Sequence, residues 1–169
     1  MSDTMPLNLR DSLAPAIPAG AEPSMFLTFS LGGEDFAVAI SFIKEVIQFS
    51  GLTAVPLMPG TILGVINLRG SVVPVIDFSV RFGRAPTQIH RRTCIVIMEL
   101  VQNEATTVLG ILVDQVREVL SIGQDEMEPT PAFGSRLPLD FIRSVGKVGG
   151  KFVPILDVDR ALSVAELAV

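Results

Sequence analysis

The sequence predicts an all-β protein made of two small β-barrels, each of about five strands, with a short helix at the C-terminus. Three observations predict this class: strand-like alternation of apolar and polar residues, an ordered internal repeat, and a composition that can bury a core. Of the 169 residues, 49% are hydrophobic and 18% are charged, which excludes a chain that is disordered throughout.

The first strands are expected to follow a flexible tail. Residues 1–24 are rich in proline and alanine and have no repeating apolar face, which is typical of an unfolded segment. Apolar and polar residues then alternate over 25–31, which predicts a strand. Residues 32–35 predict a tight turn that leads into a second strand over 36–40.

Later segments predict further strands and one helix. The apolar run over 93–100 is typical of a strand buried on both faces, and 109–113 and 116–122 are interpreted as further strands. Residues 48–68 carry no charge, but their prolines and glycines exclude a membrane-spanning helix and favour a loop followed by a strand. Apolar residues recur at helical spacing over 157–168, which predicts the C-terminal helix.

The chain repeats itself in order. Residues 36–47 match 109–120, so that Lys44-Glu45-Val46 corresponds to Arg117-Glu118-Val119. Residues 62–78 match 142–158, with seven extra residues between the two halves of the second copy. Repeats in a fixed order indicate duplicated supersecondary units.

The duplication predicts two subdomains, one over 36–90 and the other over 25–35 together with 91–165. It also matches three pairs of residues with structural roles: turn glycines that need a positive φ, prolines that mark a sheet edge or bulge, and aspartates that cap the next helical turn. The pairs are Gly70 and Gly150, Pro74 and Pro154, and Asp77 and Asp157.

Composition and motifs argue against several classes of function. With one histidine, His90, and one cysteine, Cys94, the chain offers no multi-histidine metal site, and no nucleophile elbow or phosphate loop is present, so no enzyme, cofactor or metal is expected. A net charge of -5 and a pI of about 4.8 argue against a nucleic-acid binder. No secretory signal is visible at the N-terminus, so a cytoplasmic protein with a reduced thiol is expected.

One arginine is a candidate for partner recognition. Asn67-Leu68-Arg69-Gly70 places Arg69 at a hairpin tip, whereas the second copy has Gly149 there, so the fold does not require the arginine. Its planar fork of donors suits recognition of a partner. A basic stretch follows, which either steers an acidic partner or is a solvated loop. It comprises Arg81, Arg84, His90, Arg91 and Arg92.

Five motifs together resemble the CheW family of chemotaxis coupling proteins, in order and across residues 25–165. They are F-x-L-G-x-E-x-F (29–36), I-x-x-I-K-E-V (40–46), V-P (55–56), I-L-G-V-I-N-L-R-G-x-V-V-P-V-I-D (62–77) and L-V-D-x-V-x-E-V-L (112–120). The block around N-L-R-G and V-V-P-V-I-D is specific to the family. The resemblance identifies residues 25–169 as a CheW-like domain.

The resemblance implies two five-stranded SH3-like barrel subdomains without catalytic activity or a cofactor. It implies an adaptor that couples the cytoplasmic tips of methyl-accepting chemoreceptors to the regulatory domain of the histidine kinase CheA in chemosensory arrays. Such a protein is cytoplasmic and is recruited to membrane receptor arrays without inserting into the membrane. A CheW-like adaptor of a non-flagellar system, for pili or second-messenger control, stays open as an alternative, and a nucleic-acid binder and a small enzyme are disfavoured.

The family motifs also carry over a receptor-binding surface. Arg69 of N-L-R-G matches the receptor-contacting arginine of the family, and Ile43 and Glu45 match positions on the same groove. Cys94 and Ile95 match less sharply. The expectation is an apolar groove formed by Ile43 and Ile95, with Glu45 and Arg69 as a charged rim.

Overall fold

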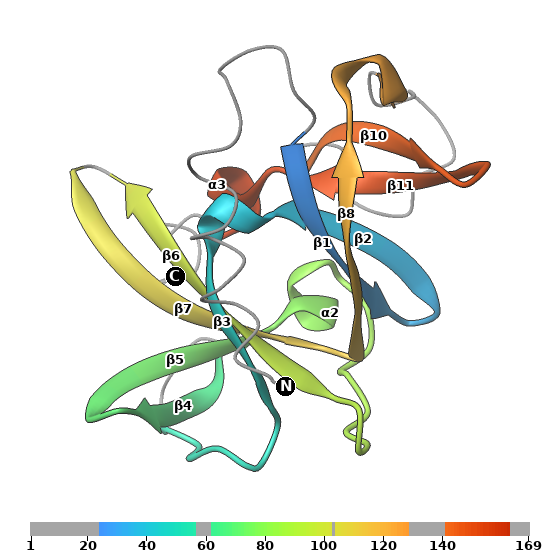
Figure 1. The fold of residues 1–169 in the computed structure, drawn as a ribbon. Coiled ribbons are helices and arrows are strands. Elements are labelled where there is room, and N and C mark those ends of the chain that lie inside the picture. Colours follow the sequence, from blue (N-terminus) through green and yellow to red (C-terminus); the bar gives the residue numbers. More distant parts are fainter. Residues whose placement is uncertain (1–23, 57–61, 103, 129–140, 163–169) are drawn as a thin grey trace, which may run out of the picture.

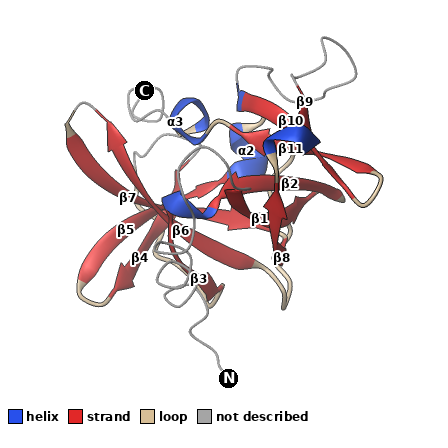
Figure 2. Cartoon of the chain, turned by 45° about the horizontal axis from the view of Figure 1, so that its top comes forward, coloured by secondary structure: helices blue, strands red, loops and turns tan. Residues whose placement is uncertain are grey.

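The computed structural model describes residues 24–56, 62–102, 104–128 and 141–162, and within them the chain is almost entirely β (Figures 1 and 2). Of the expected tail over residues 1–24, only Ser24 is described, and it begins the first strand; the part of the expected helix beyond Leu162 lies outside the described residues. The strands are β1 (Ser24–Leu31), β2 (Glu34–Ala39), β3 (Ile43–Gln48), β4 (Ile62–Leu68), β5 (Ser71–Asp77), β6 (Cys94–Gln102), β7 (Ala105–Val113), β8 (Gln115–Ile122), β9 (Met127–Glu128), β10 (Ile142–Val148) and β11 (Lys151–Leu156). The short helices are η1 (Ile40–Phe42), α2 (Phe78–Arg81), η2 (Gln124–Glu126) and α3 (Val158–Ala161).

The strands form two sheets. One has the order β8-β1-β2-β11-β10-β9, and the other has the order β3-β6-β7-β5-β4. The two-residue strand β9 is the sixth strand of the first sheet, and without it each sheet has five strands. The β4–β5 and β10–β11 hairpins project at opposite ends of the molecule (Figure 1). The predicted fold class is confirmed.

The two copies of the repeat exchange strands. Each sheet joins the first hairpin of one copy to the last three strands of the other: β1 and β2 pair with β8 and β11, while β6 and β7 pair with β3 and β5. The crossings fall between β2 and β3, at η1, and between β7 and β8, at Asp114.

This exchange corrects the expected subdomain ranges. The residues of β2 were expected with β4 and β5, but they lie in the sheet of β1, and those of β6 and β7 lie in the sheet of β4 and β5. The first crossing comes one strand later than expected and the second comes two strands later, because β1–β2 and β6–β7 each stay together as tight antiparallel hairpins.

The repeat itself is visible in the strand register. Val65 pairs with Pro74 in β4–β5, and Val145 pairs with Pro154 in β10–β11; both hairpins shift register at the start of their first strand. Pro74 lies just before Val75, where β5 begins to pair with β7, and Pro154 lies just before Ile155, where β11 pairs with β2. The N–H that each proline lacks is therefore not needed for these pairings.

The two aspartates that follow these hairpins cap α2 and α3. The Asp77 side chain accepts a hydrogen bond from the Ser79 amide (3.0 Å), and the Asp157 side chain accepts one from the Arg160 amide (3.2 Å). The repeat therefore includes both the hairpin and the capped short helix that follows it.

Three apolar clusters hold the sheets. The largest draws buried residues from both sheets and therefore lies between them; its centre includes Phe29, Phe36 and Phe78. A second cluster, around Ile122 and Ile155, belongs to the β1 sheet, and a third belongs to the β6 sheet. No helix in the described ranges is long and apolar enough to span a membrane.

Candidate functional site

The candidate site begins at the turn between β4 and β5. Arg69 has a φ of +52° and Gly70 a φ of +88°, and the Gly70 amide donates to Asn67 Oδ1 at 2.9 Å. A positive φ brings Cβ close to the backbone and is unfavourable for residues other than glycine. The second copy uses Gly149, with a φ of +56°, at this position. Arg69 therefore occupies a backbone conformation that suits glycine better.

Glu45 on β3 holds the Arg69 side chain. The guanidinium makes a two-pronged contact with the carboxylate: Nη1 donates to Oε2, and Nη2 donates to Oε1 at 3.0 Å. The hydrogen bond to Glu45, and then the carboxylate charge, raise the pKa of Arg69. The Arg69 side chain is 69% exposed and that of Glu45 only 13%. The pair thus presents an oriented cation to solvent, with its counter-charge beneath it.

A one-residue irregularity places Glu45 for this contact. The pairing of β3 with β6 shifts register between Ile43 and Glu45, so that Glu45 comes to lie opposite Ile97. β3 and β4 are the two edge strands of the five-stranded sheet. The ion pair therefore joins the two edges of that sheet through the tip that follows β4.

A hollow of about 390 Å³ lies beside the ion pair, between β3 and β4. Its wall is formed by Ile47, Gln48, Ser50, Gly51, Leu52, Thr53, Val65, Ile66, Asn67 and Ile95. Thr53 and Val65 exchange two backbone hydrogen bonds of 2.8 Å, which fixes the loop after β3 against β4. This close approach depends on Gly64, because a Cβ there would lie 2.5 Å from the Thr53 carbonyl oxygen.

The structure separates the predicted receptor-binding residues. It joins Arg69 and Glu45 directly and places Ile95 in the wall of the hollow, although the Ile95 side chain is itself buried. Ile43 is buried in the cluster between the sheets. The expectation of one groove shared by Ile43 and Ile95 is therefore wrong: the two side chains belong to different clusters.

Cys94 also faces away from the hollow. Neighbouring residues of a strand point to opposite faces, so Cys94 packs against the cluster between the sheets while Ile95 packs in the β6 sheet. Burial raises the pKa of the Cys94 thiol, against the opposing effect of a backbone hydrogen bond with Val116. A protonated, half-buried thiol is a poor nucleophile.

Sequence reasoning missed the loop after β3 and Asn67 as parts of this surface. Val72, which follows the Arg69–Gly70 turn, is also exposed. The available signals were the long uncharged stretch over 48–68 and the Asn67 side chain three residues before a turn glycine. The described residues contain no group of three or more His, Cys, Asp or Glu side chains able to hold a metal ion.

The arrangement of Arg69, Glu45 and the hollow is suited to binding another protein, because it places an oriented charge beside a partly apolar hollow.

Comparisons with known proteins agree with this reading. A family model described as the CheW-like domain matches residues 25–166. The chain is 31% identical over 144 residues to the chemotaxis protein CheW of Klebsiella aerogenes, covering 85% of this chain and 84% of that protein. It is 32% identical over 133 residues to CheW of Rhizobium meliloti, covering 79% and 83%.

A solved structure is similar as well. The scaffolding protein TtCheW from Thermoanaerobacter tengcongensis superposes with a TM-score of 0.70 at 31% identity, covering 80% of this chain and 89% of that one. The two interlocked five-stranded units define a β module of the same class as that scaffolding protein. The chain belongs to the CheW family.

Proposed function

We propose that this chain is a non-catalytic adaptor that couples chemoreceptor cytoplasmic tips to the regulatory domain of the histidine kinase CheA. Membership of the CheW family supports the adaptor role in chemosensory signalling. The adaptor acts in the cytoplasm and joins receptor arrays through binding alone. It transmits a signal when its two partners favour different states of the shared complex.

One observation carries the receptor-binding part of the proposal. Arg69 keeps a left-handed backbone conformation where the other copy has glycine, and Glu45 orients its side chain toward solvent. Unfavourable backbone conformations persist where surrounding structure holds them and often mark functional positions. Arg69, Glu45 and the hollow beside them form the proposed receptor surface. Ile43 and Cys94 contribute to it indirectly, as packing beneath β3 and β6.

Binding experiments with both partners test the proposal. The purified chain is titrated with a chemoreceptor cytoplasmic fragment and, separately, with a CheA regulatory domain from the same source, as wild type and as Arg69→Glu. Lys151→Glu is the matched control, because Lys151 is an exposed cation beside the corresponding tip of β10–β11. We expect Arg69→Glu to weaken receptor binding by at least about tenfold, because a charge reversal within the interface adds repulsion to the lost contact.

The same titrations identify the outcomes that contradict the proposal. Full receptor binding by Arg69→Glu excludes this surface as the receptor site. A wild-type chain that binds neither partner excludes the coupling function. Loss of folding in Arg69→Glu, detected by circular dichroism, would show that the arginine is structural and not a surface contact.

A further inference from the structure

The basic stretch after β5 divides into two parts with different uses. Arg81 and Arg84 serve the fold: Arg81 Nε donates to the Ala161 carbonyl at 2.7 Å, and Arg84 forms an ion pair with Glu34. Both are partly buried. The cations that remain for a partner belong to residues 89–92, the turn before β6 (the 89–92 turn).

Hydrogen bonds fix the backbone of the 89–92 turn. The His90 amide donates to Thr93 Oγ1 at 2.9 Å, and the Thr93 amide donates back to the His90 carbonyl at 3.0 Å. The Arg92 amide donates to His90 Nδ1 at 3.1 Å. Gln48 Nε2 donates to the Arg91 carbonyl at 3.0 Å and so ties the turn to β3. A backbone fixed in advance loses less conformational entropy when a partner binds.

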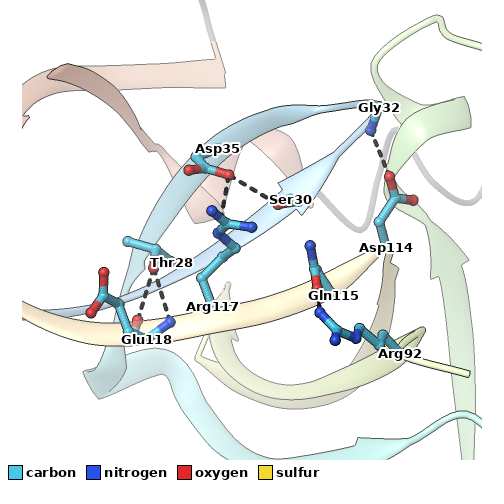
Figure 3. Close-up of polar contacts among 9 residues, drawn as sticks. All are labelled: Thr28, Ser30, Gly32, Asp35, Arg92, Asp114, Gln115, Arg117 and Glu118. Atoms are coloured by element: carbon cyan, nitrogen blue, oxygen red, sulfur yellow. Dashed lines mark hydrogen bonds and ion pairs between the residues drawn. The ribbon is translucent and has the colours of Figure 1, made fainter.

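The side chains of the turn face solvent. Ile89 is 49% exposed, and His90, Arg91 and Arg92 are exposed as well. Arg92 Nη1 lies 3.4 Å from Gln115 Oε1, a contact that Figure 3 shows with the two residues side by side. Arg91 makes no ion pair with any residue that the structure describes. The turn therefore offers a free cation beside an exposed apolar side chain.

The turn lies at the far end of the strand that carries Glu45. Gln48, which holds the turn, ends β3 and also lines the hollow. Glu45 is three residues earlier, about 10 Å along an extended strand. Asn67, close to Arg69 in sequence, lines the same hollow. The wall of the hollow thus includes Asn67, two residues before Arg69, and Gln48, whose side chain holds the Arg91 carbonyl.

We infer that the 89–92 turn is a second contact for the receptor tip, and that it binds an acidic segment of that partner through Arg91. The inference rests on the proposed function, since it assigns the turn to the same partner as Arg69. An acidic protein segment fits better than a nucleic acid. The chain as a whole carries a charge of -5 and would repel an extended polyanion, whereas a local cationic turn with Ile89 beside it suits a protein surface.

The experiment measures binding of the full chain to the receptor cytoplasmic fragment across a series of salt concentrations. The variants are Arg91→Glu, the charge-preserving Arg91→Lys, and Arg143→Glu as a matched control on an exposed arginine of β10. We expect Arg91→Glu to weaken binding by about three- to tenfold and to flatten its salt dependence, as reversal of a rim charge does. Arg91→Lys and Arg143→Glu are expected to stay within about twofold of wild type.

Arg69→Glu, measured in parallel, separates this inference from the proposed function. If Arg69→Glu loses the receptor while Arg91→Glu binds like wild type, the inference fails and the proposed function stands. If the wild-type chain does not bind the receptor fragment, both fail. The same variants are titrated with a single-stranded DNA 20-mer and with vesicles of anionic phospholipid. Binding of either probe that Arg91→Glu abolishes, with receptor binding unchanged, also overturns the inference.

Discussion

The β4–β5 and β10–β11 hairpins have the same register, and both have two residues with positive φ angles at the tip, but they carry different side chains there. Arg69 corresponds to Gly149, while the glutamate that holds Arg69 is kept in both copies, as Glu45 and Glu118. Glu118 makes no ion pair with a described residue. The second copy forms the same turn with glycine, so the turn does not need the arginine in order to form.

The loops that follow the two hairpins differ in a second way. Asp77 is buried and accepts three hydrogen bonds, from the Ser79 amide and from the amide and hydroxyl of Thr87. Asp157 accepts one, from the Arg160 amide, and lies 4.0 Å from Arg160 Nε. The first copy thus uses its capping aspartate to fix the loop that leads to the 89–92 turn as well as to start a helix.

The largest effect is expected from removing the buried cap of the first copy, with the cap of the second copy as its comparison. Asp77→Ala should lower the free energy of unfolding by about 3 kcal/mol, because it leaves the buried Ser79 amide and the two partly buried Thr87 donors without their acceptor. Asp157→Ala should cost only about 1 kcal/mol, the usual value of a helix N-cap. Urea unfolding followed by circular dichroism measures both. Equal losses would show that the extra bonds to Thr87 add no stability.

A smaller effect is expected at the start of the two hairpins, where Gly64 corresponds to Ser144. Gly64→Ala should cost about 2 kcal/mol, because its Cβ would meet the Thr53 carbonyl and the Leu52 side chain. Ser144→Ala should change stability by less than about 0.5 kcal/mol, since a Cβ is already accommodated there. The same unfolding assay compares them. An unchanged free energy of unfolding for Gly64→Ala would mean that the loop after β3 can move away from the new Cβ without destabilising the protein.

The smallest effects on stability are expected from exchanging the tip residues. Arg69→Gly should leave the free energy of unfolding equal or higher, because glycine relieves the left-handed backbone, while receptor binding falls. Gly149→Arg should cost about 1 kcal/mol for the same backbone reason. Thermal unfolding together with the receptor titration measures the pair. Clear destabilisation by Arg69→Gly would show that the contact between Arg69 and Glu45 contributes to the stability of the fold.

Much of this fold follows from sequence pattern, whereas its connectivity does not. Alternation and repeated motifs predicted most of the strands, the turns of the β1–β2, β4–β5 and β10–β11 hairpins, and two similar units, because these depend on residues close together in the chain. The strand exchange escaped prediction because it depends on pairings such as Ile155 with Ala37, which lie far apart in sequence. At the site, Arg69 was found through its mismatch with Gly149. The burial of Ile43 was missed because it follows from packing between the sheets.

The strand exchange has a consequence for fragments of this chain. A cut between β5 and β6 would give two pieces, each with four strands that have a ladder partner on the other piece. Neither piece could complete a sheet alone, so the two should recover the fold only by complementation. A single half could satisfy the same pairings by associating with a second copy of itself. The topology is therefore that of a domain-swapped homodimer whose subunits have been fused in tandem.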